Sequence, residues 1–347
     1  MKTEYDFVYL TNTPSFYKIN LCNEIAKTHS LLLVLYGYGA EAVNKDLTSG
    51  NNNLFDVHFL CNDDAHKRNK VQTFFKLFSL MRSIKVKKVL YSGWMAPEYN
   101  LYSFISPKRK NVVICESTIW ESSLNGIKGW IKKRIINRMG AALPSGEPHK
   151  ELFDSIGFKG TVNITGSVGI MNKGERKPTI PSKPLKYIYV GRLIELKNIS
   201  LLIDTFNKNG KPLTIVGKGE LEQQLKAEAN SNISFIGFVD NEKLGQVYQS
   251  HDVFILPSTY EAWGLVVEEA LYWGLPVIVS NKIGCSVDLV RTYNSGEIFQ
   301  LSDDNGLSKA IDNIEDKYNE YKSNVESIDW DGRCNNQVSA YTSLIQS

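Results

Sequence analysis

The chain has 347 residues, 42% hydrophobic and 22% charged, so it is long enough for two globular domains and too apolar for extended disorder. No apolar run approaches the roughly 20 residues of a membrane-spanning helix, and the start, Met1–Asp6, is too polar for a signal peptide. Its 5 cysteines are far apart and form no CxxC pair, which favours reduced thiols of a cytoplasmic protein over a disulfide framework or a zinc site.

The net charge of +3 hides an asymmetry between the two halves. Residues 1–173 carry 23 lysines and arginines against 14 acids, whereas residues 174–347 carry 17 against 23. The first half is therefore expected to face something anionic.

The first half alternates short apolar strands with helices. Strands are predicted at 5–10, 31–36, 55–60, 86–91, 111–115, 141–143 and 161–165, and helices at 17–27, 66–83, 124–138 and 147–156. Such alternation indicates an α/β domain with a parallel sheet and right-handed crossovers.

A linker is predicted at 173–185, in a stretch rich in proline and poor in apolar residues. The same alternation then restarts and predicts a second α/β domain at 186–320. Its strands are expected at 187–190, 213–216, 233–238, 251–256, 277–280 and 296–299, and its helices at 199–208, 220–230, 241–249, 265–273, 285–292 and 304–318. The tail, 321–347, is predicted to be helical with a kink near Trp330.

The most informative stretch runs from Pro257 to Ser280 and is predicted to form a loop, a helix and a strand. Two carboxylates, Glu261 and Glu269, lie on either side of the helix start at Gly264 and Leu265. Carboxylates suit sugar and ribose hydroxyls, while the free N–H groups and positive dipole of a helix start suit a phosphate.

This stretch, with the pattern P-S-x-x-E-x-x-G-L-x-x-x-E-A-x-x-x-G-x-P, resembles the nucleotide-sugar site of retaining glycosyltransferases of family four, the glycosyl transferases group 1. The resemblance implies a GT-B fold: two Rossmann-like domains that face each other across a cleft. Residues 1–172 would bind the acceptor and 186–320 the donor, with the helical tail 321–347 packing back on the first domain.

A second matching signature is Gly191-Arg192-Leu-Ile-Glu-Leu-Lys197-Asn, which follows a predicted strand. Arginine can grip phosphate oxygens with two parallel bonds and lysine acts as a point charge, so both could converge on one diphosphate. The alternative is a pair of surface residues in ordinary salt bridges.

Further donor residues are implied by the same resemblance. The loop at Gly217 and Gly219 matches the family's G-x-G loop, although it could be a plain turn. Phe238 and Val239 follow the next strand, where the family places the base, although Phe238 could equally belong to the core.

The resemblance also gives the roles of the charged residues. Arg192 and Lys197 would stabilise the leaving diphosphate, Glu261 would bind the donor sugar and Glu269 the ribose diol. Stabilisation by these cations requires no metal, and the sequence has no metal-ligand cluster.

The first half carries the acceptor-side candidates. The loop with Pro14, Ser15 and Tyr17 resembles a loop of the bacterial polysaccharide-building branch, with Lys18 where arginine is common. Glu116 follows a strand where many members place a catalytic residue; it is either the acceptor-facing base or a solvated loop carboxylate. Trp94 either lines the acceptor cleft or belongs to the core.

One predicted helix, 124–138, is both basic and apolar. It could rest on an anionic membrane, or it could present one core face and one solvated face. No nucleic-acid motif accompanies it. Its cations are Lys128, Lys132, Lys133, Arg134 and Arg138.

The resemblance thus implies a retaining hexosyltransferase that needs no metal. It would move a sugar from a nucleotide-diphospho-sugar, expected to be UDP-linked, to a glycan or lipid-linked acceptor. Surface polysaccharide (lipopolysaccharide or capsule) biosynthesis at the inner face of the plasma membrane is the expected setting. The alternatives are an epimerase or phosphorylase of the same fold and a non-catalytic nucleotide-sugar-binding protein.

Overall fold

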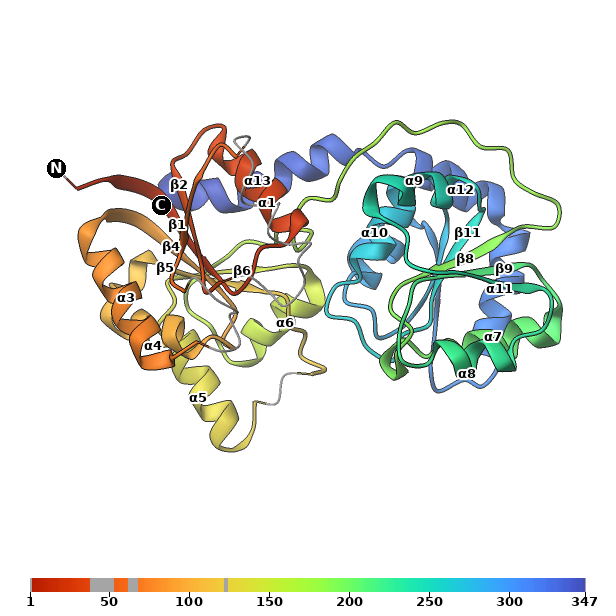
Figure 1. Ribbon diagram of the computed structural model, residues 1–347, viewed down its shortest axis with the longest axis horizontal. Helices are drawn as coiled ribbons and strands as arrows, with labels where there is room; N and C mark the ends of the chain where they lie inside the picture. The colour runs from red at the N-terminus through yellow and green to blue at the C-terminus, as the bar shows by residue number, and fades with distance from the viewer. Residues whose placement is uncertain (1, 38–52, 62–67, 122–123, 347) are drawn as a thin grey trace. The chain divides into compact units, whose positions relative to one another are not determined.

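The computed structural model describes residues 2–37, 53–61, 68–121 and 124–346 (Figure 1). The chain divides into two compact units. Unit 1 comprises Met1–Asn172 together with Asp331–Ser347, and unit 2 comprises Lys173–Trp330.

In unit 1, strands of the described chain form one parallel sheet in the order β3-β2-β1-β4-β5-β6-β7. Its central strands are buried along most of their length because helices cover both faces, and apolar runs are the sequences that such strands need. The strands are β1 (Glu4–Thr11), β2 (Leu31–Leu35), β3 (Asp56–Phe59), β4 (Lys85–Ser92), β5 (Asn111–Cys115), β6 (Ala141–Pro144) and β7 (Thr161–Val162).

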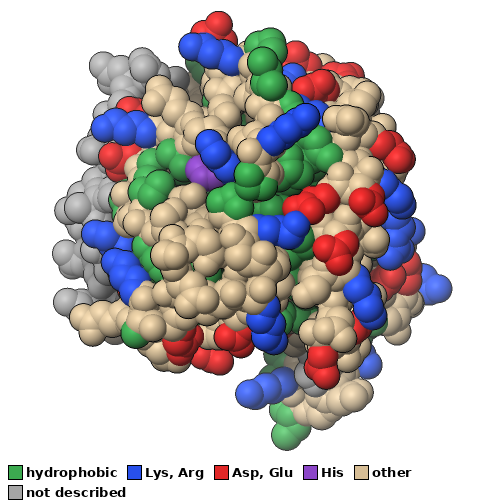
Figure 2. All heavy atoms as spheres, turned by 90° about the vertical axis from the view of Figure 1, so that its right-hand side faces the viewer, with side chains coloured by type: hydrophobic (Ala, Val, Ile, Leu, Met, Phe, Trp, Pro, Cys, Tyr) green, Lys and Arg blue, Asp and Glu red, His purple; other side chains and the backbone are tan. Residues whose placement is uncertain are grey.

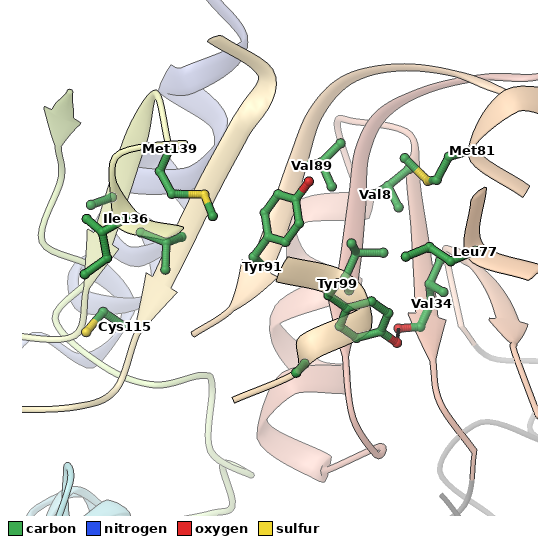
Figure 3. Close-up of a cluster of buried hydrophobic side chains, with 14 of the residues drawn as sticks. Val8, Val34, Leu77, Met81, Val89, Tyr91, Tyr99, Cys115, Ile136 and Met139 are labelled. Atoms are coloured by element: carbon green, nitrogen blue, oxygen red, sulfur yellow. Dashed lines mark hydrogen bonds between the residues drawn. The ribbon is translucent and has the colours of Figure 1, made fainter. Parts of the chain in front are cut away.

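Two buried clusters hold the helices of unit 1 on its sheet. In one of them, Leu77 and Met81 from helix α3 belong to the same cluster as Val8, Tyr91 and Tyr99 (Figure 3). In the other, helix α13 at the C-terminal end contributes side chains to the opposite face of the sheet. The helices are α1 (Phe16–Ala26), α3 (Lys70–Ser83), α4 (Pro97–Ile105), α5 (Gly126–Ile136), α6 (Glu147–Ser155) and α13 (Trp330–Gln346), with a 3-10 turn η3 at Lys108–Lys110.

Unit 1 differs from the predicted elements in three places. Helix α4 was not predicted, β7 ends at Val162 rather than at 165, and α3 begins at Lys70, after 68–69 of the predicted helix 66–83. Residues 66–67 lie outside the described residues. The tail 321–347 was predicted to pack on the first domain. Only its part from Asp331 onward belongs to unit 1, whereas 321–330 belongs to unit 2.

Unit 2 contains a second parallel sheet, in the order β10-β9-β8-β11-β12-β13. The two predicted parallel α/β sheets are thereby confirmed. The strands are β8 (Tyr187–Val190), β9 (Leu213–Val216), β10 (Ile233–Ile236), β11 (Val253–Leu256), β12 (Val277–Ser280) and β13 (Gly296–Phe299). The helices are α7 (Ile199–Asn209), α8 (Glu222–Glu228), α9 (Asn241–Gln249), α10 (Leu265–Tyr272), α11 (Gly306–Asp316) and α12 (Tyr318–Glu326), with a 3-10 turn η4 (Glu195–Lys197) and a π-helix η5 (Ser286–Arg291).

The segment 173–185 has no regular secondary structure but is anchored to unit 2. The Asp252 carboxylate accepts hydrogen bonds from the backbone N–H of Ser182, at 3.1 Å, and of Lys186, at 2.8 Å. The Gly174 N–H donates to the Tyr272 hydroxyl at 3.1 Å. These contacts fix the entry of the chain into β8.

Each sheet has one point at which the strand order reverses, between β1 and β4 in unit 1 and between β8 and β11 in unit 2. In open parallel α/β sheets, ligands bind beyond the carboxyl ends of the strands at such a point. The candidate residues that follow β1, β4, β8 and β11 therefore lie where such a ligand would bind.

The face of the molecule drawn in Figure 2 mixes lysine and arginine with aspartate and glutamate side chains. No helix in the described part of the chain is long and apolar enough to cross a bilayer.

Candidate active site

In unit 2, the turn after β8 packs against the loop after β11. The Thr259 N–H donates to the Leu196 carbonyl at 3.0 Å, and the Asn198 side-chain amide donates to the Pro257 carbonyl at 3.2 Å. This contact brings the Lys197 ammonium against Glu261 Oε1, where the two form an ion pair. The strand-order reversal between β8 and β11 is what makes these two loops neighbours.

The Glu261 carboxylate is held on several sides. The Ser258 hydroxyl donates to the same Oε1 atom at 3.1 Å. The backbone N–H of Glu261 donates to the Lys282 carbonyl, and its carbonyl accepts from the Gly284 N–H, both at 3.0 Å. The side chains of Lys197 and Glu261 are only 12% and 17% exposed, so solvent screens their attraction less than in an open surface pair.

Both recorded side-chain contacts of Glu261 in the described chain go to Oε1. Its Oε2 atom is thus the oxygen best placed to accept hydrogen bonds from a ligand's hydroxyl groups. The ion pair orients the carboxylate for that role.

Close backbone packing explains the glycines of the neighbouring loops. Gly217 has a φ of +135°, and a Cβ there would lie 1.9 Å from the Gly191 carbonyl oxygen. A Cβ at Gly219 would lie 2.2 Å from the Leu193 carbonyl oxygen. The loops after β8 and β9 therefore touch through their backbones, and no larger residue fits between them.

Helix α10 begins at Leu265, directly after Gly264, whose φ of +97° is the left-handed conformation that favours glycine. Its first backbone N–H groups are the donors that a phosphate or a carboxylate would use. The helix start lies beyond the carboxyl end of β11, on the same side of the sheet as Glu261.

Glu269 lies one turn into α10 and is half-buried. Burial raises the pKa of Glu269 to about 7, although the Tyr248 hydroxyl, which donates to its Oε2 at 3.3 Å, acts in the lowering direction. A carboxyl with this pKa exchanges its proton near neutral pH. Hydrogen-bond donors from a ligand would favour its charged form.

The remaining donor-side candidates lie at the ends of β8 and β10. Arg192 is exposed, and its carbonyl accepts a hydrogen bond from the Tyr189 hydroxyl at 3.0 Å. Phe238 is 68% exposed, so the alternative that it belongs to the core is wrong. Val239 beside it is half-buried. In the described chain, none of these side chains has a recorded bond to the Lys197–Glu261 pair.

Unit 1 has a pocket of about 280 Å³ at its own strand-order reversal, beyond the ends of β1, β4 and β5. Ser15, Tyr17, Trp94 and Glu116 line this pocket, whereas Pro14 is buried and is not part of its lining. The name acceptor-side pocket is used below for this cavity. Trp94 packs partly on the core and partly faces the cavity, and its place in an acceptor cleft stays a prediction.

A half-buried ion pair lies in the wall of the acceptor-side pocket. The Lys18 ammonium is 3.3 Å from Glu116 Oε1, and the two side chains are 13% and 32% exposed. Burial alone would lower the pKa of Lys18, but the Glu116 carboxylate together with Tyr9 and Tyr17 more than offsets this and leaves the pKa above its usual value. Glu116 is therefore more than a solvated loop carboxylate.

Three site residues were given no role by sequence reasoning: Lys18, Ser258 and Tyr248. Ser258 could have been found, because it stands within the matched pattern three residues before Glu261. Tyr248 and Lys18 meet their carboxylates only through the tertiary fold, and the sequence carries no signal of either contact.

Comparison with known proteins agrees with this geometry. Residues 171–327 match the family described as "Glycosyl transferases group 1". Unit 2, Lys173–Trp330, thus coincides with the span that matches this family. The matched span contains the Lys197–Glu261 pair, both glycine loops and α10.

Relatives and solved structures extend the comparison. The O-antigen chain mannosyltransferase C of Escherichia coli is 27% identical over 176 residues, which cover 46% of this chain and 47% of that protein. The lipopolysaccharide outer core galactosyltransferase WaaB in its apo form aligns with a TM-score of 0.74 at 13% identity, covering 97% of this chain and 99% of that one. Anabaena Alr3699/HepE in complex with UDP-glucose aligns with a TM-score of 0.67 at 16% identity, covering 98% and 97%.

The structural alignments span both units, and the chain has the GT-B fold that the resemblance implied. The sequence matches are shorter: the chain spans less than half the length of the curated relatives that it matches.

Proposed function

We propose that the chain is a retaining glycosyltransferase that uses a nucleotide-diphospho-sugar, with UDP as the nucleotide carrier. The observation that carries this proposal is the ion pair of Lys197 and Glu261 at the strand-order reversal of unit 2. Alr3699/HepE, which has the same fold, was solved with UDP-glucose, and this supports the choice of UDP.

The charges of the site residues indicate which part of the donor each would bind. Glycosyl transfer leaves negative charge on the departing diphosphate, so cations and N–H donors aimed at it stabilise the transition state. Lys197, Arg192 and the N-terminus of α10 at Gly264 and Leu265 take this role. They act by electrostatics alone and move no proton.

The carboxylates and loops hold the rest of the donor. Glu261 accepts hydrogen bonds from the sugar hydroxyls through Oε2, and Glu269 accepts them from the ribose diol. Gly191, Gly217 and Gly219 leave the backbone open to the nucleotide, and Phe238 with Val239 covers the base. Phe238 is exposed, so it can stack on a planar ring.

The acceptor is proposed to enter the acceptor-side pocket of unit 1. Glu116 is the carboxylate there that can accept a proton from the attacking hydroxyl, and Lys18 holds it in place. Ser15 and Tyr17 supply hydroxyl groups that suit a carbohydrate. Pro14 shapes this loop from the buried side.

We further propose that the acceptor is a glycan or a lipid-linked oligosaccharide of a surface polysaccharide pathway, met at the inner face of the membrane. The names of two similar proteins, an O-antigen mannosyltransferase and a lipopolysaccharide galactosyltransferase, support this setting. Lys128, Lys133 and Arg134 on α5 suit anionic lipid. Arg138 is engaged within unit 1, where it donates to carbonyls at the end of α4.

The test is product analysis with a panel of nucleotide sugars and a mixed glycan acceptor. We expect transfer of the sugar with retained anomeric configuration. Both Glu261→Gln and Lys197→Met should abolish this transfer. A change of the donor sugar without any transfer would indicate an epimerase, and uptake of phosphate would indicate a phosphorylase. Glu242→Gln, on the exposed side of α9, is a matched control that should transfer like the wild type.

A further inference from the structure

A second and larger cavity of unit 1 lies between helices α4 and α5, which are neighbours in Figure 1. It has a volume of about 750 Å³ and is called the α4–α5 groove below. Leu101 and Phe104 of α4 form one wall, and Trp130 and Ile131 of α5 form the other. Its volume lies in the range of small-molecule sites, roughly 300–1,000 Å³.

The walls of the groove are unusually apolar for an exposed surface. Leu101 is 57% exposed, Phe104 48% and Trp130 60%. Met95, which also lines the groove, is 81% exposed. Single exposed apolar residues are ordinary, but a contiguous group that lines a cavity marks a binding surface.

Cations rather than acids accompany these apolar walls. Lys70 and Arg134 line the groove, and among its described lining residues there is no aspartate or glutamate. The Arg134 guanidinium lies 5.3 Å from the Trp130 ring centroid, and the Lys132 ammonium lies 5.0 Å from that of Trp94. The occupant that fits this chemistry is apolar along its length and anionic at one end.

The α4–α5 groove adjoins the acceptor-side pocket, because Trp94 and Met95 line both cavities. Glu116 lines the acceptor-side pocket. A chain that lies in the groove would therefore bring its polar end to the residues proposed to bind the acceptor.

From these contacts we propose that the α4–α5 groove binds the hydrocarbon chain of a phosphate-bearing, lipid-linked acceptor. The chain packs between Leu101, Phe104 and Trp130, the phosphate lies near Arg134 and Lys132, and the glycan part reaches the acceptor-side pocket. This inference rests on the proposed function and names the acceptor class of that same site.

If α5 instead lay flat on a membrane, every apolar side chain that it exposes would contact lipid. Ile127 would be among them, because it is 79% exposed, although it does not line the groove. Ile127 therefore separates a chain held in the groove from a helix resting on lipid.

The experiment uses 12-bromododecyl phosphate, kept below its micelle concentration, as a quencher of tryptophan fluorescence in the full chain. Saturable quenching is expected, and Trp130→Phe should remove a large part of the quenched signal. Leu101→Asp should raise the half-saturating concentration about tenfold or more, because the chain would desolvate the new carboxylate and the phosphate would be repelled by it.

Two matched variants place the same charge elsewhere on unit 1. Phe75→Asp, on the exposed face of α3, and Ile127→Asp should both bind the probe like the wild type. Arg134→Gln should weaken binding of the phosphate but not of 12-bromododecanol, and it keeps the test valid if Leu101→Asp fails to fold. The proposal is overturned if quenching does not saturate, if Leu101→Asp and Arg134→Gln bind like the wild type, or if Ile127→Asp weakens binding as much as Leu101→Asp.

Thermal stabilisation by UDP-glucose, measured on the same samples, distinguishes a failure of the groove proposal from a failure of the proposed function. Loss of probe binding with intact donor stabilisation would refute the groove alone. Absence of donor stabilisation in the wild type would count against the proposed function, whatever the probe does.

Discussion

Replacing Glu269 with glutamine is expected to stabilise the free protein and to weaken donor binding at the same time. Burial raises the pKa of Glu269 to about 7, against an ordinary value of 4.5. The folded state thus holds this proton more tightly than the unfolded chain, so folding stability falls as the pH rises from about 4.5 to about 7. The difference of about 2.5 pH units corresponds to about 3 kcal/mol, an upper value because the side chain is partly exposed.

Urea unfolding at pH 5 and pH 8 measures this effect. Glu269→Gln should gain about 1–3 kcal/mol over the wild type at pH 8 and much less at pH 5, since the glutamine has no proton to lose. Glu228→Gln, an exposed glutamate of the same unit, is the matched control and should show no such gain.

Donor binding gives the second half of the test. At pH 6 only about a tenth of Glu269 carboxyls are ionised in the free protein, so the wild-type affinity for the donor should fall about tenfold between pH 8 and pH 6. In Glu269→Gln the affinity should be weaker and should lack this pH dependence. Equal wild-type affinities at pH 6 and pH 8, or a loss of stability in the glutamine variant at pH 8, would refute the reasoning.

Three further outcomes follow from the described contacts. Gly217→Ala should lower stability and donor affinity together, since its Cβ would collide with a backbone carbonyl; thermal unfolding with and without UDP measures both. Glu98→Gln should cost about 3 kcal/mol or more, because it removes the buried carboxylate that Arg68, 2.8 Å away, is paired with. The bonds from Arg68 and Tyr36 outweigh burial and hold the pKa of Glu98 below its usual value, so this contribution should fade in urea titrations as the pH drops below about 4.5. Glu116→Gln should lower kcat for transfer while leaving donor affinity unchanged in calorimetry; a change in donor affinity instead would contradict its place on the acceptor side.

The sheets could be predicted because their strands are short apolar runs separated by turn residues. Runs such as 31–35 and 277–280 need burial on both faces, and a parallel α/β sheet provides it. Helix α4 was missed although Pro97 stands at its first turn, a known start signal, because its aromatic and polar residues show no clear apolar stripe.

The candidate site was predictable only where its residues lie within one motif. Glu261 and Glu269 belong to a single stretch, and the pattern around them is specific. Contacts between distant segments are different in kind: Tyr248 reaches Glu269 from α9, and Lys18 reaches Glu116 from α1. Such pairs depend on strand order and crossovers, which the local sequence does not encode.

The α4–α5 groove illustrates the same limit. The sequence predicted a basic and apolar helix at 124–138 and left open whether its apolar side faced a core or a membrane. Its Trp130 and Ile131 instead form one wall of a cavity whose other wall is the unpredicted α4. One missed helix was enough to hide the groove.

Binding of a nucleotide sugar to the Lys197–Glu261 pair is tested most directly by thermal unfolding with a panel of UDP-, GDP- and ADP-linked sugars. A ligand at about 100 times its Kd stabilises the folded state by about 2.7 kcal/mol, which corresponds to about 5–10 °C for a unit of this size. At least one UDP-sugar should raise the Tm of the wild type by that amount, and Lys197→Met and Glu261→Gln should lose most of the shift. No shift with any sugar nucleotide, or equal shifts in the wild type and both variants, would contradict the proposed donor site.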